Sequence, residues 1–598
     1  LDEARRRHIV WPHPDDDHCS FVHDKLREAL LARLTDADRR TLHRLAARLL
    51  EHHHPDRLFD LAYHFDAGGE HERALPHALT AGAQARAQHA LEVAERQYRI
   101  ALRGSVDAED PVRRRAVQGL GEVLMLRGSY DEAATRLEQA STLADDDVTR
   151  ARIAAQLGEL AFKRGDVQAG AQALERGLHL LHQRVPRRRI AVGAWLVWEL
   201  LVQVLHTVAP RAFLGRRSAE AADTALLAIH LYSRLTYAYW FGSGTLACGW
   251  SHLREMNLAE RYPPGLARAQ AYSEHAPVLT MLPFFRRGIT YAQRSLAIRR
   301  DARDAWGEGQ SLHFYGVVLY GASRYREAME RCREGARLLE QTGDRWEVNT
   351  ANWHVAYCLY RLGSLREAVD AARAVHQAGV EIGDAQAAGI SLSVWAKASG
   401  GRVPPELIDA ELARGGGDGH TTAEVLQARA VCLLAGARPD EAVAVLEEAR
   451  SLLKARGLRQ EYVAPVLPWL ATARREQVLA TQDVTPDSRR RLLREARRAA
   501  GRPPPPPHGA LVPQQPAARA AGVRAGRRPA GTVVARPAPL RPQPGGGVPA
   551  VRRMGARADP PRPWPGRSGA RLARRGGGPR RGGRRHGRAG RRRAGRAG

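Results

Sequence analysis

The run Tyr272–His275 reads Tyr-Ser-Glu-His and carries the side chains that hydrolases use. It supplies a hydroxyl nucleophile, a carboxylate and an imidazole base, and His313 and His354 follow in later segments. A catalytic triad, however, needs its nucleophile on a strained elbow within hydrogen-bond reach of the base. No Gly-x-Ser-x-Gly pattern supplies that elbow, and we therefore assign no catalytic residue.

Histidines crowd the N-terminal part of the chain and raise the question of a metal site. They are His23, His43, His52, His53, His54 and His64. His52–His54 precede Pro55, so we expect a loop with diverging imidazoles, and no acidic residue stands at ligand spacing. We expect solvated or helix-capping histidines here, with no metal ion and no other cofactor in this chain.

Phosphate chemistry has no recognisable motif. A phosphate-binding loop ends in Gly-Lys-Ser/Thr, but none of Lys25, Lys163, Lys397 and Lys454 follows a glycine. A glycine-rich kinase loop, His-Arg-Asp and Asp-Phe-Gly are also missing. The chain by itself is therefore not expected to be an enzyme.

Five aromatic residues and one arginine of the central region can line a ligand or peptide groove on a concave surface. They are Trp306, Phe314, Tyr315, Arg345, Trp346 and Trp353. The alternative, which we favour, is that the aromatic rings fill gaps between packed helices.

The charge of the chain is concentrated at its C-terminal end. Residues 501–598 contain 24 Arg, 20 Gly, 18 Pro and 17 Ala with a single acid, Asp559. Such a composition cannot bury a core and predicts a disordered tail. These four residue types have GC-rich codons, and a shifted reading frame is our preferred origin of the tail. The rival interpretation is an RNA-binding arm, although Trp564 is its only aromatic residue for stacking on bases.

The first 500 residues are nearly charge-balanced, with 69 basic and 63 acidic residues, and their charge is no evidence for nucleic acid. Five cysteines stand far apart without a Cys-x-x-Cys pair, as expected for buried thiols in a reducing compartment. The longest apolar run, 190–210, contains Glu199, Gln203 and His206. We predict a buried helix there and no membrane span.

The elements that position these residues are helices. Ala, Leu, Arg and Glu recur at helical spacing with Gly or Pro at the joints, which predicts an all-α protein. Small residues also recur with offsets of 12 and 7, as expected where two helices cross closely. The copies are Ala62/Ala74/Ala81, Gly121/Ala133/Ala140, Gly158/Gly170/Gly177, Gly316/Ala328/Gly335, Ala430/Ala442/Ala449 and the imperfect Ala356/Ala368/Val375.

This pattern resembles the tetratricopeptide helix-turn-helix repeat, and the longer spacing between copies predicts a degenerate solenoid. Before it, the segment 21–29 and the residues Leu42-His43 predict two helices, the second capped by Thr35 or Asp36. This N-terminal pattern resembles the small winged-helix-like domain that follows the ATPase core in signal-transducing ATPases with numerous domains. A DNA-binding role for it is disfavoured, because Asp15–Asp17 and Asp24 would repel phosphate.

Four central segments look like the repeat region of large ATPase-coupled sensor kinases and transcriptional regulators. They are 257–264, 271–277, 309–316 and 342–349. The resemblance spans about 18–500 and implies four parts. We expect a winged-helix-like hinge at 1–55, tetratricopeptide-like repeats at 56–185, a sensor region continuing the solenoid at 186–500 and the tail at 501–598.

The resemblance implies a cytoplasmic regulatory region that binds a protein partner or ligand and controls an output module absent from this chain. The upstream ATPase core and the downstream output domain of the parent protein are its further implied partners, and no membrane partner is expected. Two alternatives remain open. One is a nucleic-acid-binding protein that acts through its Arg-rich tail, and the other is a fragment of a histidine or serine/threonine kinase.

Overall fold

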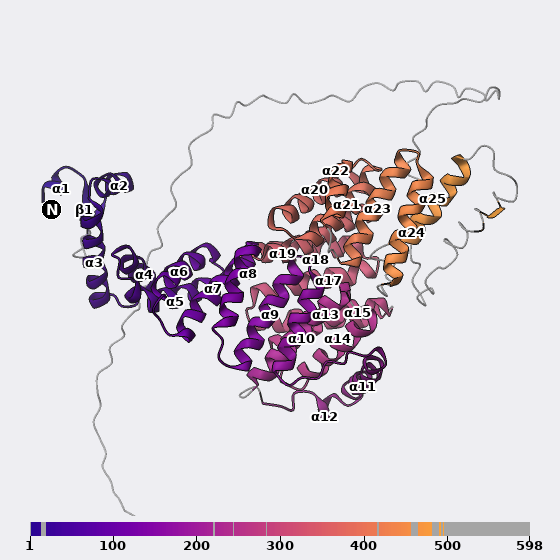
Figure 1. The fold of residues 1–598 in the computed structure, drawn as a ribbon, viewed down its shortest axis with the longest axis horizontal. Coiled ribbons are helices and arrows are strands. Elements are labelled where there is room, and N and C mark those ends of the chain that lie inside the picture. The colour runs from indigo at the N-terminus through magenta and orange to yellow at the C-terminus, as the bar shows by residue number, and fades with distance from the viewer. Residues whose placement is uncertain are drawn as a thin grey trace, which may run out of the picture. The chain divides into compact units, whose positions relative to one another are not determined.

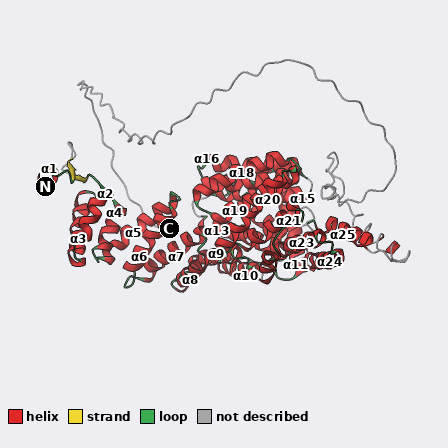
Figure 2. Ribbon diagram, turned by 90° about the horizontal axis from the view of Figure 1, so that it is seen from above, coloured by secondary structure: helices red, strands yellow, loops and turns green. Residues whose placement is uncertain are grey.

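A computed structural model of the chain describes residues 2–12, 19–218, 222–242, 244–282, 284–414, 418–455, 465–480, 490–491 and 494. Twenty-five helices and one two-stranded sheet are found among them (Figures 1 and 2). The all-α prediction is therefore confirmed. The predicted tail, 501–598, lies outside the described residues.

The N-terminal part contains one feature that the sequence did not suggest, a short β-hairpin. The elements are α1 (Asp2–Arg6), β1 (Val10–Pro12), β2 (Cys19–Phe21), α2 (Asp24–Ala32) and α3 (Asp36–His53). The strands are antiparallel, with Val10 opposite Phe21. Thr35 caps α3, since its hydroxyl accepts a hydrogen bond from the Asp38 amide at 3.2 Å.

The predicted loop at His52–His54 is wrong. His52 and His53 form the last turn of α3, and only His54 lies beyond it as the C-cap residue. Imidazoles are favourable there because the C-terminal end of a helix carries a partial negative charge. His23 is a capping histidine as expected, because its Nδ1 accepts a hydrogen bond from the Lys25 amide at 3.2 Å.

Each of the next seven helices packs on its sequence neighbours within this group. They are α4 (Leu58–Ala67), α5 (His71–Ala87), α6 (Leu91–Gly104), α7 (Asp110–Arg127), α8 (Tyr130–Thr142), α9 (Asp147–Lys163) and α10 (Val167–Leu180). The helices of the central part are α11 (Arg189–Val208), α12 (Pro210–Phe213), α13 (Asp223–Gly242), α14 (Thr245–Ala259), α15 (Leu266–Met281) and α16 (Phe285–Asp301).

The packing of each helix on the next one continues in the last third of the described chain. Its helices are α17 (Ala305–Gly321), α18 (Tyr325–Thr342), α19 (Arg345–Leu362), α20 (Leu365–Ile382), α21 (Ala385–Ser399), α22 (Pro405–Ala413), α23 (Gly419–Ala435), α24 (Pro439–Ala455) and α25 (Val466–Ala480). The architecture is a tetratricopeptide-like helical solenoid.

The small-residue triplets lie where the sequence analysis placed them. In every copy the first member is on one helix of a pair and the other two are on the second helix. A Cβ added to Gly316 would lie 3.0 Å from the Ala328 carbonyl oxygen, and one on Gly335 would lie 2.7 Å from the Gly309 carbonyl oxygen. The two helices of this pair therefore approach so closely that only small side chains fit.

Helices that are distant in sequence also touch. α7 contacts α19, and α13 contacts α23. A Cβ added to Gly128, after α7, would lie 2.8 Å from Ile382 at the end of α20. The early and late repeats thus pack on one another in addition to their sequence neighbours.

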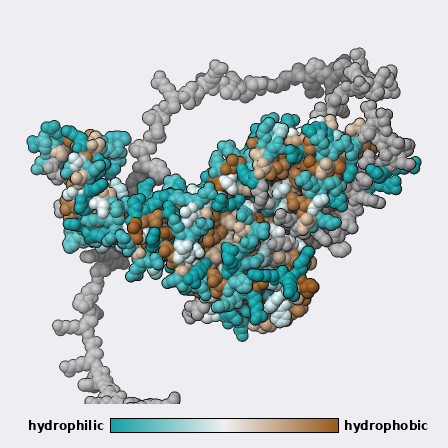
Figure 3. Space-filling view, viewed as in Figure 1, coloured by the Kyte–Doolittle hydropathy of each residue, from teal (hydrophilic) through white to brown (hydrophobic). Residues whose placement is uncertain are grey.

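Helix α11 differs from the prediction of a buried helix. Its polar residues Glu199, Gln203 and His206 are buried, whereas Leu201 and Val204 are each 56% exposed. By length and composition alone α11 is long and apolar enough to cross a membrane, and 22% of its apolar window is buried in the protein. Figure 3 shows apolar side chains on the surface at its position. The polar residues are inside because they pair with α14 and the turn after it, as when Asn257 donates to Glu199 at 2.8 Å.

Among the cysteines whose side chains are described, Cys248, Cys332 and Cys358 are buried and Cys432 is half-buried, all as free thiols. Burial raises the pKa of Cys248 and Cys358 to about 12. They behave as small apolar side chains, as the sequence analysis expected.

Candidate functional site

A groove with a volume of about 530 Å³ opens along α19 and α20. α19 contributes one face of its surface, and the small side chains Ala371, Ala374 and Ala378 of α20 leave the space unfilled. The lining residues are Glu340, Gly343, Arg345, Val348, Asn349, Asn352, Val355, Ala371, Ala374, Val375 and Ala378.

The face of α19 in the groove combines amides with apolar side chains. Asn349 and Asn352 are three residues apart and lie on adjacent turns, between Val348 and Val355. Asn352 forms no hydrogen bond with any residue that the structure describes. Its amide can therefore both donate to and accept from a ligand.

Asn349 connects the groove to the next repeat. Its Nδ2 donates to Oδ2 of Asp384 at 3.3 Å. Asp384 is buried and also caps α21, where its Oδ1 accepts from the Ala387 amide at 3.0 Å. Burial raises the pKa of Asp384 to about 7, although the hydrogen bonds from Ala387 and Asn349 oppose that rise.

Charge at the groove comes from Glu340 and from Arg345, which the sequence analysis had proposed as a groove residue. The Arg345 side chain is the cation of the two. Its guanidinium forms an ion pair with Glu381 at 3.0 Å, and both side chains are about half exposed. Such an exposed pair contributes little to stability, so the guanidinium can leave Glu381 at little cost for an acidic ligand group.

The other five residues proposed for a groove do not line this one. The Trp306 indole donates to Oδ2 of Asp344 at 3.1 Å, whereas the Trp346 ring packs against Phe162. Trp353 packs in the core between α20 and α21. The Phe314 ring is tilted against the Tyr237 ring, and Tyr315 packs against α16 and α18. Of the six proposed residues, the structure thus places Arg345 alone on this groove.

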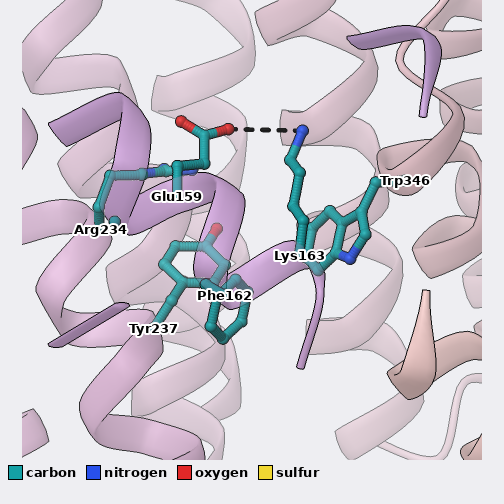
Figure 4. Close-up of a pocket in the computed structure, with 7 residues that line it drawn as sticks. Glu159, Phe162, Lys163, Arg234, Tyr237 and Trp346 are labelled. Carbon is teal, nitrogen blue, oxygen red and sulfur yellow. Dashed lines mark ion pairs between the residues drawn. The ribbon is translucent and has the colours of Figure 1, made fainter. Parts of the chain in front are cut away.

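Trp346 borders a small interior cavity whose lining residues come from α9, α13 and α19 (Figure 4). The cavity measures about 10 Å³, which is room for a single water molecule. Lys163 lies between Glu159 at 3.4 Å and Asp344 at 3.3 Å, and its ammonium is 5.6 Å from the Trp346 ring. This Lys163–Asp344 ion pair joins two residues that are 181 positions apart in the sequence, at the end of α9 and at the cap of α19.

The interior charges balance one another. Burial by itself would lower the pKa of Lys163, but Asp344 and Glu159 raise it above its ordinary value. Glu347 is buried beside Asp344, and burial together with that carboxylate raises its pKa to about 7. Gln310 donates to Glu347 at 2.8 Å. The cluster is therefore a polar core with little free space, not a ligand cavity.

A third group lies between α14 and α15, where His252, Glu255 and Glu274 bring ligand atoms within 4.8 Å of one another. All three side chains are buried, and they are the residues with which this part of the chain can hold a metal ion. The sequence analysis missed this group. His252-x-x-Glu255 places both on one helical face, but only the packing of α15 adds Glu274.

The run Tyr272–His275 forms no triad in the described part of the chain. The Ser273 hydroxyl is buried without a hydrogen-bond partner, and the Tyr272 hydroxyl donates to Glu260 at 3.2 Å. Nδ1 of His275 instead lies 2.9 Å from Nε2 of His252. His313 and His354 form a separate pair at 3.1 Å.

No protein-family model matches the chain, and no curated protein matches it. Solved structures that it resembles are helical-repeat proteins at low identity. A Rap protein complexed with Competence and Sporulation Factor has a TM-score of 0.39 at 12% identity, covering 68% of this chain and 98% of that chain. Aspartyl phosphate phosphatase F from Bacillus subtilis has a TM-score of 0.37 at 11% identity, covering 64% and 92%.

A signal transduction ATPase with numerous domains from Pyrococcus horikoshii, which carries a tetratricopeptide repeat sensor, has a TM-score of 0.34 at 13% identity. The match covers 75% of this chain and 60% of that protein.

Proposed function

We propose that this chain is the sensor region of a multidomain signal-transduction ATPase. In this proposal it acts in the cytoplasm, binds a protein partner or ligand, and controls an output module outside these 598 residues. The observation that carries the proposal is the open groove along α19 and α20, with an unpaired amide at its centre. The parent protein is proposed from the sequence resemblance alone.

The groove fits an extended peptide segment. Asn352 offers an unpaired donor and acceptor, which is what a peptide group requires, and Asn349 lies one turn away in its pair with Asp384. Val348 and Val355 provide apolar contact, and the alanines of α20 leave room for side chains. Arg345 can pair with an acidic residue of the peptide, and Glu340 in the same groove favours a basic residue beside it.

The same helix connects ligand binding to the interior. A peptide that engages Asn349 competes with Asp384, whose carboxyl group caps α21. Glu347, on the same helix as Asn349, belongs to the charged cluster that joins α19 to α9. In this proposal the ligand shifts the packing of early and late repeats, and that shift is the signal passed to the output module.

The experiment is a phage-display selection of peptides against the full chain, followed by fluorescence anisotropy with the selected peptides. Asn352→Leu should weaken binding about fivefold to tenfold, because each net hydrogen bond contributes about 1 kcal/mol. Val348→Glu should abolish binding. Arg326→Ala, on the exposed surface of α18, is the matched control and should bind normally. Peptides that bind all four proteins equally would refute the groove as the ligand site.

A second readout concerns catalysis. The purified chain should hydrolyse no ATP, because it has no phosphate-binding loop. ATP turnover that copurifies with the chain through several columns would contradict the sensor proposal.

A further inference from the structure

Three buried side chains direct free lone pairs at one another between α14 and α15. His252 and Glu255 lie one turn apart on α14, and Glu274 lies opposite on α15. Their exposed fractions are 1%, 0% and 7%. One ligand atom from each lies within 4.8 Å of the other two.

The orientation of the imidazole is set from outside the group. Nε2 of His252 lies 2.9 Å from Nδ1 of His275, and the two rings are stacked. When Nε2 carries the proton and donates it to His275, Nδ1 of His252 is left with a lone pair. That Nδ1 has no hydrogen-bond partner, and the nearest carboxylate oxygen of Glu255 is 3.8 Å away.

The carboxylate of Glu274 is held in the same one-sided way. Its Oε1 accepts hydrogen bonds from Ser233 at 2.6 Å, Arg234 at 3.2 Å and Gln270 at 2.6 Å. Its Oε2 has no partner. Hydrogen-bond donors therefore hold Oε1 of Glu274 in place and leave its Oε2 free to face His252 and Glu255.

Glu255 completes the group with two buried oxygens, neither of which has a hydrogen-bond partner. Arg234 is the cation that faces the group from α13, and its bond goes to Oε1 of Glu274. A nitrogen and several oxygens thus face one another with no donor from the surrounding described residues between them. Buried acceptors in such an arrangement require either a cation or a shared proton.

We propose that His252, Glu255 and Glu274 bind a divalent transition-metal ion, with Zn²⁺ as the best fit. One imidazole nitrogen and two carboxylates are ligands that Zn²⁺ accepts, whereas Mg²⁺ and Ca²⁺ prefer oxygen alone. Two carboxylates neutralise the charge of the ion. His275 orients His252, and Ser233 and Gln270 orient Glu274 through their hydrogen bonds, as is usual around metal ligands. The bound ion would link α14 to α15 through ligands from both helices.

The rival occupant is one proton shared by Glu255 and Glu274. Either occupant satisfies the same lone pairs, so the experiment must distinguish them. Glu255→Gln is the key variant, because an amide replaces the carboxyl group without a change in size and removes a ligand. Gln270→Leu keeps all three ligands and removes one donor to Glu274.

The full chain is produced in medium supplemented with zinc, exchanged into buffer with micromolar Zn²⁺, and analysed for metal content and thermal stability. Wild-type protein should retain one more equivalent of Zn²⁺ than Glu255→Gln and should melt at a higher temperature when Zn²⁺ is present. Gln270→Leu should bind about 10–100-fold more weakly. With Co²⁺, only proteins that keep all three ligands should show visible absorption bands.

Exposed histidines such as His52 and His53 can also bind Zn²⁺, but wild type and Glu255→Gln share them. The difference in zinc content between the two proteins therefore excludes their contribution. Glu327→Gln, an exposed carboxylate paired with Arg324, is the matched control and should bind like wild type. Equal metal content in wild type and Glu255→Gln would overturn the proposal. So would metal-free wild-type protein with a carboxylic-acid infrared band that Glu255→Gln abolishes, because a shared proton then occupies the group.

Discussion

Ala328 and Arg326 stand two positions apart on α18 and have opposite environments. Ala328 is fully buried where α18 crosses α17, and Arg326 is exposed. Ala328→Arg should destabilise the protein by on the order of 3 kcal/mol or more, through overpacking and an unpaired buried charge. Arg326→Ala should change stability by no more than about 0.5 kcal/mol. Urea unfolding of both full-length variants measures the difference, and equal effects would refute the repeat register.

The buried carboxyl group of Asp384 predicts a pH dependence of stability. Its pKa is about 7 in the folded protein against 3.8 as its ordinary value. The folded state therefore holds a proton that the unfolded state has lost, and this contribution to stability decreases as pH rises towards 7. Asp384→Asn removes the titration.

The free energy of unfolding of Asp384→Asn, relative to wild type, should accordingly rise by about 2–3 kcal/mol between pH 5 and pH 8. Urea unfolding at the two pH values measures it. Glu347 titrates in the same range but is present in both proteins, so its contribution cancels in the comparison. A difference that does not change with pH would show that Asp384 is ionised throughout.

At the scale of elements, the orientation of α11 predicts that a new charge on its apolar face is tolerated, whereas a new apolar residue on its buried polar face destabilises the protein. Leu201→Glu adds a charge at a position that is 56% exposed and should change stability by no more than about 0.5 kcal/mol. Glu199→Leu adds an apolar residue to an apolar helix, yet it should cost about 3 kcal/mol. The reason is that Arg254, at 3.2 Å, and Asn257 lose their buried partner.

Thermal unfolding of both variants tests this orientation of α11. A helix buried by its apolar face would show the opposite order, with Leu201→Glu the more harmful change. The apolar periodicity of 190–208 specifies a helix, but it does not say which face is inside. That choice depends on Arg254, Asn257 and Glu260 of another segment, which offer the polar residues better partners than water.

At the scale of the whole molecule, the Lys163–Asp344 ion pair joins repeats that lie far apart in sequence. Lys163→Met leaves Asp344 without its buried cation and should cost about 3–5 kcal/mol. Lys163→Met combined with Asp344→Asn should recover part of that loss, because no unpaired buried charge then remains at these two positions. A double-mutant cycle by urea unfolding gives the coupling, and additive losses would show that the two residues act independently.

The composition of the tail, 501–598, predicts that the whole chain binds polyanions without selectivity. With 24 Arg and one acid, it should bind single-stranded RNA and heparin alike, with an affinity that falls steeply with salt. Deleting residues 501–598 should abolish that binding and leave the total helical circular-dichroism signal of the molecule unchanged. Preference for one RNA sequence over heparin at physiological salt would favour the nucleic-acid-binding alternative.

The sequence by itself determined the class of fold and the register of its repeats. Small residues at offsets of 12 and 7, as in Gly316, Ala328 and Gly335, are a local requirement of two helices that cross closely. Local requirements can be read from one segment, and for that reason the helix pairs and the cap at Thr35 agree with expectation. The prediction of a loop at His52–His54 was wrong because a proline can directly follow the end of a helix, as Pro55 does here after α3 and its cap residue His54.

Only the tertiary structure decided which side chains meet across the solenoid. Trp346 borders the small interior cavity, while the adjacent Arg345 lines the groove along α19 and α20, because neighbours on a helix point about 100° apart. Glu274 joins His252 and Glu255 only through the packing of α15 on α14. Such contacts depend on the rotation of each helix about its axis, and that rotation is set by the packing of all the repeats together.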